Sequence, residues 1–533
     1  MADGFRRRDF LKAVGAGAAA MAAPTASRTV QGQSPNPRQR PDDRPNVLFI
    51  MTDQHRADYM TCAGNDTVPT PNIDRVAERG VRFENAYCPY PVSLASRSAL
   101  LTSLYAHTTG AINNDGLLDW RYRSVADHFA ENGYLTGLVG KMHFNDAHNH
   151  GFHYYLSIND WLVYLGPRVQ TYANEIANHP LNKNYFFNRV KDIGAGFPDV
   201  DVWHEDSPWE GTVERRDFDT VVSRMDAEHH LDMFLARESV RFLERYREQP
   251  FFLVTSFMKP HTPFFPPREW AEKYPIEDME LPEIGDISGY PKHIQARIRR
   301  HMQISERRRR AAMAGYLGNL AFVDHCVGKV LDGLEELGLA ENTIVVYTSD
   351  HGEMQGDHGL FQKFCLFDPA VKVPLIVAHP GSIPRGRVTD ALTEYIGLYP
   401  TLSDLAGLPR PTARPLVPFE DAPDRLGAAS FADLARNPDA KGPEAVFSEY
   451  ALRSRNPRYM VRTRRWKYIH NQGGSCHELY DLENDPGEFK NRIHDSECRD
   501  IARDHRDRLF AWYDPKSNPY TPLNQPEKAS SGG

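Results

Sequence analysis

The sequence has few cysteines and none of the paired spacing that a structural zinc site needs. The six cysteines are scattered, and no two of them are separated by only two residues. A zinc site built from cysteine is therefore not expected. Their positions leave open whether any pair forms a disulfide bond. They are Cys62, Cys88, Cys326, Cys365, Cys476 and Cys498.

An excess of basic charge is also missing. Lys and Arg total 63 of the 533 residues and Asp and Glu total 71, which gives a formal net charge of −8. Proteins that bind nucleic acid usually carry an excess of basic charge. We therefore expect no nucleic-acid partner, although a local basic pocket for a small anion is compatible with this total.

Long apolar runs are absent too, and the N-terminal residues are typical of an export signal instead. Residues 7–12 read RRDFLK, which matches the twin-arginine pattern, and a weakly apolar run follows over residues 13–23. Ala20-Met21-Ala22 resembles a cleavage site. The run is too short for a bilayer, which takes roughly 20 residues to cross. We expect residues 1–44 to be a signal and linker, with export by the twin-arginine machinery to the periplasm or beyond and no stable membrane insertion.

Four short apolar runs predict strands that are buried in a parallel sheet. They are Asn46–Met51, Tyr134–Gly140, Phe251–Phe257 and Thr343–Thr348. Each run is followed at once by ionisable side chains. Open α/β sheets place their ligands at the carboxyl ends of the strands, so these side chains predict one shared site. They are Asp53, Lys141, His143, Lys259, His261, Asp350 and His351.

Helical patterns lie between these runs, which predicts an α/β fold with a large, mostly parallel sheet and helices on both faces. The predicted helices are Asn72–Arg79, Ser124–Asn132, Ala227–Arg247 and Arg307–Leu337. We expect this catalytic domain to cover residues 45–408.

The stretch from about 145 to 226 interrupts the alternation and is rich in aromatic side chains. They are Tyr154, Tyr155, Trp161, Trp203 and Trp209. Either this insertion covers the site and stacks on a sugar, or it is a packed subdomain with its own aromatic core.

A Pro-rich segment after Leu405 predicts a domain boundary. Beyond it, three short strand patterns and a helical pattern over Cys498–Tyr513 predict a small antiparallel sheet with a helix against it. We expect this C-terminal α+β domain to cover residues 409–533. The strand patterns are Tyr459–Val461, Trp466–Ile469 and Leu479–Leu482.

The stretch Pro91–Ser103 reads PVSLASRSALLTS and places Ser93 four residues before Arg97, at the start of an apolar helical run. An oxygen at that point faces free backbone N–H groups and the positive end of the helix dipole, which is a suitable place to hold an anion. Alone, the pattern is also that of an ordinary serine cap.

Taken together, the chain resembles a sulfatase of the alkaline-phosphatase superfamily over Asn46 to about Asn491. The stretches that carry the resemblance are NVLFIMTDQHRAD, PTPNIDRVAERGVRFENAY, SLASRSALLTS, GLVGKMHF, FMKPHTPF, YTSDHGEMQGDHGLFQK, VKVPLIV and, near the C-terminus, RTRRWKYI and HELYDLENDPGE. Each is weak alone, and the set in this order is specific.

The resemblance implies that Ser93 is oxidised to formylglycine by a serine-type maturase, because SLASR matches the family motif C/S-x-P/A-x-R. Cys88 is excluded as the target because Val92, not Arg, follows it by four residues. Two positions depart from the commoner family pattern: Ala95 replaces Pro, and Ser103 replaces Gly.

The resemblance also implies a divalent cation. Asp53, Gln54, Asp350, His351 and an oxygen of residue 93 would hold it. Such oxygen-rich ligation favours Ca²⁺ first and Mg²⁺ next, and the imidazole of His351 leaves Mn²⁺ open.

Catalytic roles follow from the same resemblance. Arg97 would hold the hydrated aldehyde of residue 93, with Lys141 and His143 beside it and His143 as the base. His261 and Lys363 would face the ester, with His261 as the acid that protonates the leaving oxygen. Candidates of lower rank are Lys259, His107, His358 and Asp357.

Three functions are compatible with the sequence. The first is an exported hydrolase that releases sulfate from a sulfated carbohydrate or another sulfate monoester. The second is a phosphatase or a phosphonate or phosphodiester hydrolase on the same scaffold. The third, a non-catalytic carbohydrate-binding protein, is disfavoured because the charged set is complete.

Overall fold

The computed structural model describes residues 44–168, 201–202, 220–223, 225–474 and 476–524. Residues 1–43, which contain the predicted export signal, lie outside the described residues, as do Trp203 and Trp209 of the predicted insertion. All six cysteines are described, and each is a free thiol.

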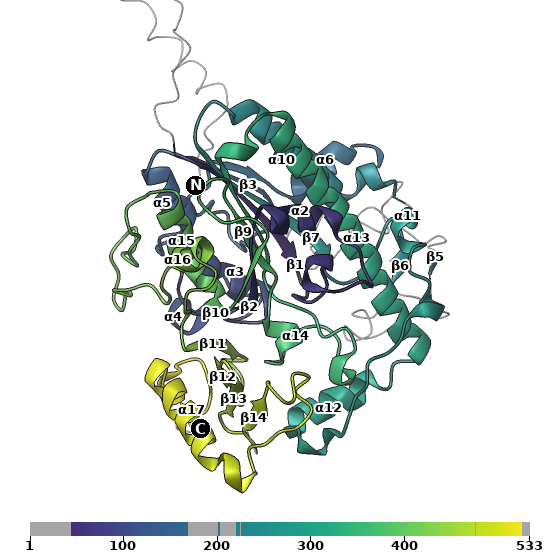
Figure 1. Cartoon of the computed structure of the whole chain (residues 1–533), viewed down its shortest axis with the longest axis vertical. Coiled ribbons are helices and arrows are strands. Elements are labelled where there is room, and N and C mark those ends of the chain that lie inside the picture. The colour runs from purple at the N-terminus through teal and green to yellow at the C-terminus, as the bar shows by residue number, and fades with distance from the viewer. Residues whose placement is uncertain (1–43, 169–200, 203–219, 224, 475, 525–533) are drawn as a thin grey trace, which may run out of the picture. The chain divides into compact units, whose positions relative to one another are not determined.

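In the described part of the chain, eight strands form one large sheet in the order β10-β2-β9-β8-β1-β7-β3-β4 (Figure 1). All of them run in the same direction except β9, which is antiparallel to both of its neighbours, β2 and β8. The prediction of a large, mostly parallel sheet is therefore confirmed. The strands are β1 Asn46–Asp53, β2 Gly80–Tyr87, β3 Leu135–Gly140, β4 Tyr154–Leu156, β7 Phe251–Pro260, β8 Thr343–Ser349, β9 Leu375–Ala378 and β10 Arg387–Glu394.

The four strands predicted from apolar runs are β1, β3, β7 and β8, and they are neighbours at the centre of the sheet. Their registers align their ends: Thr52 of β1 pairs with Ser349 of β8, and Gly140 of β3 pairs with Ser256 of β7. The residues that follow these strands therefore emerge at one edge of the sheet.

Both faces of the sheet are covered, because alternate side chains of β1 enter two separate cores. Val47, Phe49 and Met51 belong to one core, and Leu48 and Ile50 belong to the other. Helices α3, α5 and α15 pack into the first core, while α2, α10 and α13 pack into the second. Their bounds are α2 Pro71–Arg79, α3 Ser93–Thr102, α5 Val125–Glu131, α10 Leu231–Tyr246, α13 Glu306–Glu336 and α15 Leu398–Leu405.

Shorter elements complete the described chain. They are α4 Ala106–Thr109, α6 Ile158–Leu165, α11 Arg268–Ala271, α12 Lys292–His301, α14 Asp368–Val371, α16 Ala432–Arg436 and the two-residue strands β5 Asp201–Val202 and β6 Val221–Val222.

The described part of the predicted insertion packs onto the main domain. Strand β4 extends the large sheet beside β3. Trp161 is buried, and its Nε1 donates a hydrogen bond to the carbonyl of His229 at 2.7 Å. Tyr155, in contrast, is 41% exposed. Trp161 therefore serves packing, which favours the aromatic-core interpretation for this part of the insertion.

A second sheet, antiparallel and in the order β11-β12-β13-β14, lies near the C-terminus with helix α17 against it. This confirms the predicted small antiparallel sheet and helix, and adds β11, which the sequence patterns missed. The elements are β11 Ala445–Tyr450, β12 Arg458–Thr463, β13 Trp466–Asn471, β14 Glu478–Asp481 and α17 Arg499–Trp512.

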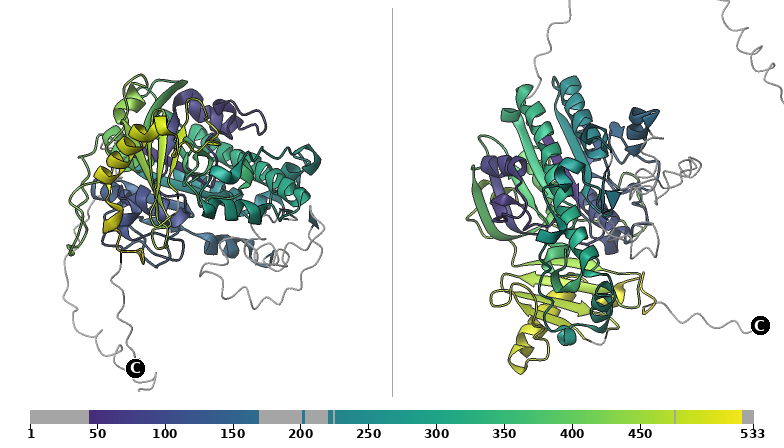
Figure 2. Two further views of the ribbon diagram at one scale, coloured as in Figure 1. Left: turned by 90° about the horizontal axis from the view of Figure 1, so that it is seen from below. Right: turned by 90° about the vertical axis from the view of Figure 1, so that its right-hand side faces the viewer.

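The small sheet shares a core with the start of α3. Leu479 of β14 and Leu509 of α17 belong to the same buried cluster as Val92 and Ala95. The described residues from Arg44 onward belong to one compact unit, so contacts continue across the boundary near residue 408, which stays a prediction. The right-hand view in Figure 2 shows the small sheet below the main domain.

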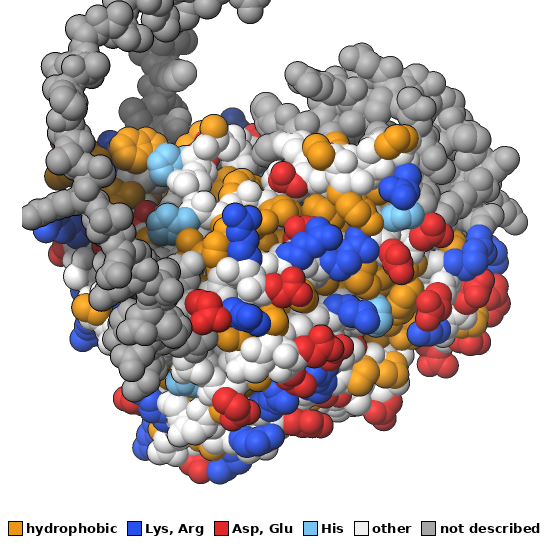
Figure 3. All heavy atoms as spheres, turned by 90° about the horizontal axis from the view of Figure 1, so that it is seen from above, with side chains coloured by type: hydrophobic (Ala, Val, Ile, Leu, Met, Phe, Trp, Pro, Cys, Tyr) orange, Lys and Arg blue, Asp and Glu red, His pale blue; other side chains and the backbone are white. Residues whose placement is uncertain are grey.

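The charges on one face of the molecule and the apolar character of the described helices can be compared with what the sequence predicts. On the face in Figure 3, basic and acidic side chains are interspersed with apolar ones and form no continuous basic stripe. Among the described residues, no helix has both the length and the apolar character needed to cross a membrane.

Candidate active site

Ser93, which the sequence predicts to be the modified residue, is the first residue of α3 and is fully buried. The helix is followed by Ser103 as its C-cap, and the φ of Ser103, 54°, lies in the left-handed region that favours glycine. Ser103 donates a hydrogen bond from Oγ to the carbonyl of Ile396 at 2.8 Å. Serine therefore occupies a position where the backbone alone would favour the glycine that is commoner in the motif.

Arg97, one turn further along α3, holds the strand ends together. Its Nε donates to Oδ2 of Asp350 at 2.8 Å, and its Nη2 donates to Oδ2 of Asp53 at 3.0 Å. Its Nη1 donates to the carbonyl of Lys141 at 2.6 Å and to Oγ of Ser256 at 2.8 Å. All of the Arg97 side chain is buried. One guanidinium therefore joins the ends of β1, β3, β7 and β8.

Asp53, the last residue of β1, is a buried carboxylate among cations. Its Oδ2 also accepts a hydrogen bond from Nζ of Lys141 at 2.5 Å. Burial alone would raise the pKa of Asp53, but the surrounding cations, Lys141 foremost, hold that pKa well below its usual value. Its other oxygen, Oδ1, is buried and has no hydrogen-bond partner among the described residues. Asp53 is thus charged, with one free oxygen.

His351 presents a lone pair toward that free oxygen and toward Ser93. Its Nδ1 lies 3.0 Å from the carbonyl of Gly352, so Nδ1 carries the proton and donates. Its Nε2 lies 3.1 Å from Oγ of Ser93 and 3.9 Å from Oδ1 of Asp53. Burial lowers the pKa of His351 to about 4 despite the neighbouring Asp350. A neutral imidazole with an unprotonated Nε2 is the form that binds a metal ion.

These groups fit a divalent cation. Asp53, Asp350 and His351 are buried, and each offers a ligand atom within 4.8 Å of the other two. The unpartnered Oδ1 of Asp53 and the unprotonated Nε2 of His351 have the chemistry of ligands, and Oγ of Ser93 lies beside them. Two carboxylates and an imidazole suit Ca²⁺, Mg²⁺ or Mn²⁺.

Gln54, the fourth predicted ligand residue, uses both ends of its amide for other partners. Its Oε1 accepts a hydrogen bond from Nζ of Lys363, and its Nε2 donates to Oε2 of Glu353. Glu353 also accepts from the backbone N–H groups of Gln355 and Gln362. Glu353 has no predicted role, although it stands in the motif SDHGE that carries the resemblance.

His261 and Lys363 form a pair next to this amide. Nζ of Lys363 lies 3.0 Å from Nε2 of His261, whose Nδ1 faces the carbonyl of Thr262. Because a carbonyl only accepts, Nδ1 carries the ring proton and Nε2 accepts from Lys363. Burial lowers the pKa of His261 well below its usual value, and Lys363 acts in the same direction. Burial also lowers the pKa of Lys363.

His143 lies just beyond Lys141 at the end of β3; the residue is partly buried, and both of its ring nitrogens are buried. Burial lowers its pKa well below the usual value, and the charges of Lys141 and Arg97 add to that effect. The imidazole is therefore neutral near pH 7 and has a ring nitrogen able to accept a proton.

Two candidates of lower rank have structural partners instead. Nζ of Lys259 donates to the carbonyl of Phe265 and to Oδ1 of Asn319, both at 2.7 Å. Nδ1 of His107 lies 2.8 Å from Oε2 of Glu449. Both side chains therefore stabilise local packing.

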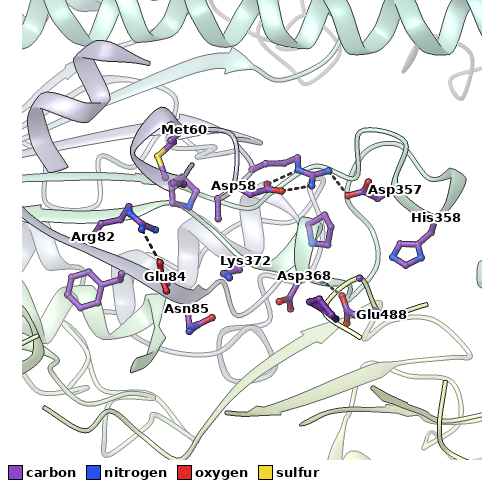
Figure 4. A pocket seen from close by; sticks show the side chains of 18 of the residues that line it. Asp58, Met60, Arg82, Glu84, Asn85, Asp357, His358, Asp368, Lys372 and Glu488 are labelled. Atoms are coloured by element: carbon purple, nitrogen blue, oxygen red, sulfur yellow. Dashed lines mark hydrogen bonds and ion pairs between the residues drawn. The ribbon is translucent and has the colours of Figure 1, made fainter. Parts of the chain in front are cut away.

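The other two, Asp357 and His358, line a separate cavity of about 550 Å³ between the large sheet and the C-terminal region (Figure 4). Arg56 pairs there with Asp58 at 2.7 Å and with Asp357 at 2.8 Å. None of the residues gathered around Ser93 and Asp53 lines this cavity.

The family model described as Sulfatase matches residues 45–408, which is more than half of the chain. The chain belongs to the sulfatase family. A second family model, described as N-sulphoglucosamine sulphohydrolase, C-terminal, matches residues 356–513 of this sulfatase.

Curated relatives of the sulfatase match over most of its length. An arylsulfatase of Clostridium perfringens is 28% identical over 86% of this chain and 92% of the relative. Iduronate 2-sulfatase of Mus musculus is 30% identical over 75% of this chain and 76% of the relative. N-acetylglucosamine-6-O-sulfatase of Bacteroides thetaiotaomicron is 26% identical, over 86% and 84%. The protein is therefore an enzyme of the sulfuric-ester hydrolase class.

Solved structures share the fold of the sulfatase. The phosphonate monoester hydrolase of Agrobacterium radiobacter superposes with a TM-score of 0.69 at 23% identity, over 88% of this chain and 95% of that one. The structure of BT4656 in complex with its substrate D-glucosamine-2-N,6-O-disulfate superposes with a TM-score of 0.66 at 22% identity. The match covers 89% of this chain and 99% of that one. Both likenesses support the alkaline-phosphatase-like fold alone.

Proposed function

We propose that this sulfatase releases sulfate from a sulfated carbohydrate, by means of a formylglycine made from Ser93 and a divalent cation held by Asp53, Asp350 and His351. The observation that carries the proposal is the contact of Ser93 Oγ with Nε2 of His351, 3.1 Å away, inside a buried group of two carboxylates and several cations. A helix start at the same point adds backbone N–H groups for an anion.

Hydrolysis of the sulfate ester would need two groups besides the side chains described above, a divalent cation and the formylglycine. The cation, when bound, offsets the charge of the sulfate oxygens and lowers the pKa of a nearby hydroxyl. The formylglycine, when hydrated, supplies two hydroxyl groups where Ser93 has one, so that one can attack sulfur and the other can later lose its proton.

Arg97 and Lys141 would orient and neutralise the reacting groups. Arg97 is fixed by four acceptors and Lys141 by Asp53, so neither needs to reorganise as charge develops on the ester. Donors that are already in place are worth far more in a site without water than in solution.

His261 and Lys363 would protonate the leaving oxygen as a unit. In the free protein the shared proton resides on Lys363, because Nε2 of His261 is the acceptor in their contact. Nζ of Lys363 can pass one of its protons to the leaving oxygen, while Nε2 of His261 accepts another hydrogen bond from Nζ and holds the amine in place. The general acid, which the sequence predicts to be His261 alone, is therefore proposed to be the pair of His261 and Lys363.

His143 would accept the proton that the second hydroxyl of residue 93 loses. Its buried neutral ring suits a base, and the neighbouring Lys141 disfavours a second positive charge before the reaction. The lost proton would then leave the site with the released product.

The names of the relatives support a carbohydrate substrate. Two of the sulfatases above are named for N-acetylglucosamine and iduronate esters, and the second family model is named for N-sulphoglucosamine. The RRDFLK motif supports export by the twin-arginine machinery to the periplasm or beyond. A serine-type maturase would act on Ser93 before export.

Matched aryl esters test the class of reaction. We expect protein that is co-expressed with a serine-type maturase to hydrolyse 4-nitrophenyl sulfate faster than 4-nitrophenyl phosphate or phenylphosphonate monoesters. Mass spectrometry of the peptide over residue 93 should show the loss of two hydrogens. Faster cleavage of the phosphorus esters would favour the phosphonate or phosphate hydrolase, whose fold is shared.

A further inference from the structure

Arg297 of α12 and the proposed catalytic lysine lie next to the same aromatic ring. Its Cζ is 5.7 Å from the centroid of the Phe364 ring, and Nζ of Lys363 is also 5.7 Å from that centroid. The two cationic groups are therefore separated by no more than twice this distance. Nη2 of Arg297 donates to the carbonyl of Phe361 at 2.5 Å, which fixes the guanidinium.

Arg458, the first residue of β12 in the C-terminal sheet, extends this arrangement to a row of two arginines and two aromatic rings. The row is Arg297, Phe364, Tyr450 and Arg458. Its Cζ lies 5.2 Å from the centroid of the Tyr450 ring, and the rings of Tyr450 and Phe364 are 6.3 Å apart. Figure 1 shows α12 beside the small sheet, and a hydrogen bond of 3.2 Å between Asn456 and His293 joins the two. The row thus spans three segments that are distant in sequence.

Neither arginine pairs with a carboxylate among the described residues. Nη1 of Arg297 and Nε of Arg458 are buried and have no hydrogen-bond partner there. Glu478 contributes to the field at Arg458, but its oxygens accept hydrogen bonds from Asn471 and Tyr480. The two guanidinium groups thus keep donors that no protein acceptor uses.

The charge at this place is uncompensated as well. Burial lowers the pKa of His293 to about 3, with Arg458 and Arg297 acting in the same direction, so this ring is neutral. Both arginine side chains are only partly buried, so an anion in solution can approach them. The planar fork of arginine matches the oxygens of a carboxylate or a sulfate.

We propose that Arg297 and Arg458 form a second anion subsite, which binds a carboxylate or a second sulfate of the sugar while the ester sulfate lies at residue 93. The proposal rests on the function proposed above and narrows the substrate to a sugar, or a short oligosaccharide, with at least two anionic groups. A ligand without the second anion would lack the charge-assisted contact with these partly exposed arginines and would bind more weakly.

Competitive inhibition of 4-nitrophenyl sulfate hydrolysis by the full-length enzyme tests the subsite. The probes are N-acetylglucosamine 6-sulfate, glucosamine 2-N,6-O-disulfate, and a sulfated disaccharide whose uronate carboxyl is either intact or reduced to the alcohol. We expect each doubly anionic probe to bind at least roughly 10-fold more tightly than its singly anionic partner, because one extra charge-assisted contact is worth that much. The disulfate and uronate arms identify which anion is preferred.

Substitution of the two arginines tests whether they cause the tighter binding of doubly anionic probes. In Arg297→Gln and Arg458→Gln the ratio of inhibition constants should fall to near one, while Arg297→Lys should keep part of it. Arg299→Gln, an exposed neighbour on α12 that bonds to Gln295, should keep the whole ratio. Aryl sulfate turnover in each variant is the reference, since that substrate has no second anion.

Two results would overturn the subsite: a wild-type enzyme with equal affinity for both probes of a pair, or a double glutamine variant that keeps the preference. Failure of the proposed function would look different, because 4-nitrophenyl sulfate would then not be hydrolysed. In that case calorimetric titration of the same probes still measures the preference and decides whether the subsite exists.

Discussion

Nζ of Lys363 lies 3.0 Å from Nε2 of His261, and this contact makes the two side chains one proton donor. The finding modifies the role that the sequence assigns to His261 alone. It also explains why the partly buried His261 and the buried Lys363 tolerate each other: desolvation lowers the pKa of both, so that they share fewer protons than they would in water.

Replacement of either member should therefore affect substrates according to their leaving groups. In His261→Ala and in Lys363→Ala, hydrolysis of alkyl or sugar sulfates should fall by about 10²–10⁴-fold, the usual share of acid catalysis, because their alcohols need a proton. Aryl sulfates, with better leaving groups, should lose less. Plots of log kcat against leaving-group pKa measure the difference. Equal losses on both substrate types would rule out a role in protonation.

Metal content should depend on Asp350. In Asp350→Asn the charge that faces Arg97 and the proposed cation disappears, so both the bound divalent cation and the activity should be lost. The activity loss should exceed the 10–100-fold that is typical when only an outer partner of a ligand is removed. Elemental analysis and turnover on the same preparation check this.

Asp357→Asn is the matched control, because Asp357 pairs with Arg56 in the separate cavity of Figure 4. It should keep both the cation and the activity. An Asp350→Asn enzyme that retains its full cation content would show that Asp350 is not a ligand.

The amide of Gln54 either positions Lys363 through hydrogen bonds or binds the cation, and variants distinguish these two roles. The hydrogen bonds to Lys363 and Glu353 predict that Gln54→Ala and Glu353→Gln lower kcat by about 10–100-fold through misplacement of Lys363, with the cation content unchanged. Turnover and elemental analysis of the purified variants check both parts. A parallel loss of cation in Gln54→Ala would instead support the ligand role that the sequence predicts.

Stability should vary with pH because of Glu394, to which we assign no role in the reaction. Burial raises the pKa of Glu394 to about 7, although Tyr105 donates a hydrogen bond to its carboxyl. Because the folded pKa lies above the ordinary value of 4.5, this residue favours the folded state fully below pH 4.5 and loses that contribution as the pH rises through 7. The total change is up to about 3 kcal/mol.

Glu394→Gln cannot titrate, so its stability relative to the wild type should increase between pH 5 and pH 8. Urea unfolding at several pH values gives this difference directly. A difference between the two proteins that stays constant with pH would contradict the raised pKa.

Those parts of the site that depend on residues close together in the sequence could be predicted from sequence patterns. The four runs that became β1, β3, β7 and β8 were recognisable because strands buried on both faces are continuously apolar. Their polar ends then had to meet, as the carboxyl ends of neighbouring parallel strands do. Ser93 was recognisable because it lies at a helix start four residues before Arg97.

Other features depend on contacts between distant segments and leave no local pattern. Glu353 matters because it reaches Gln54, and Arg297 because α12 meets the row of rings that ends at Arg458. The reversed strand β9 carries no signal of its direction in a short apolar run. Only the folded chain brings these residues together.

The most direct test of the central claim is the relation between turnover and the modification of Ser93. Preparations made with increasing amounts of a serine-type maturase would be compared for sulfate release per molecule and for the fraction of residue 93 converted, measured by mass spectrometry. The account predicts that the rate rises in proportion to the converted fraction and vanishes in Ser93→Ala. Unconverted protein, or Ser93→Ala, that releases sulfate as fast as converted protein would contradict it.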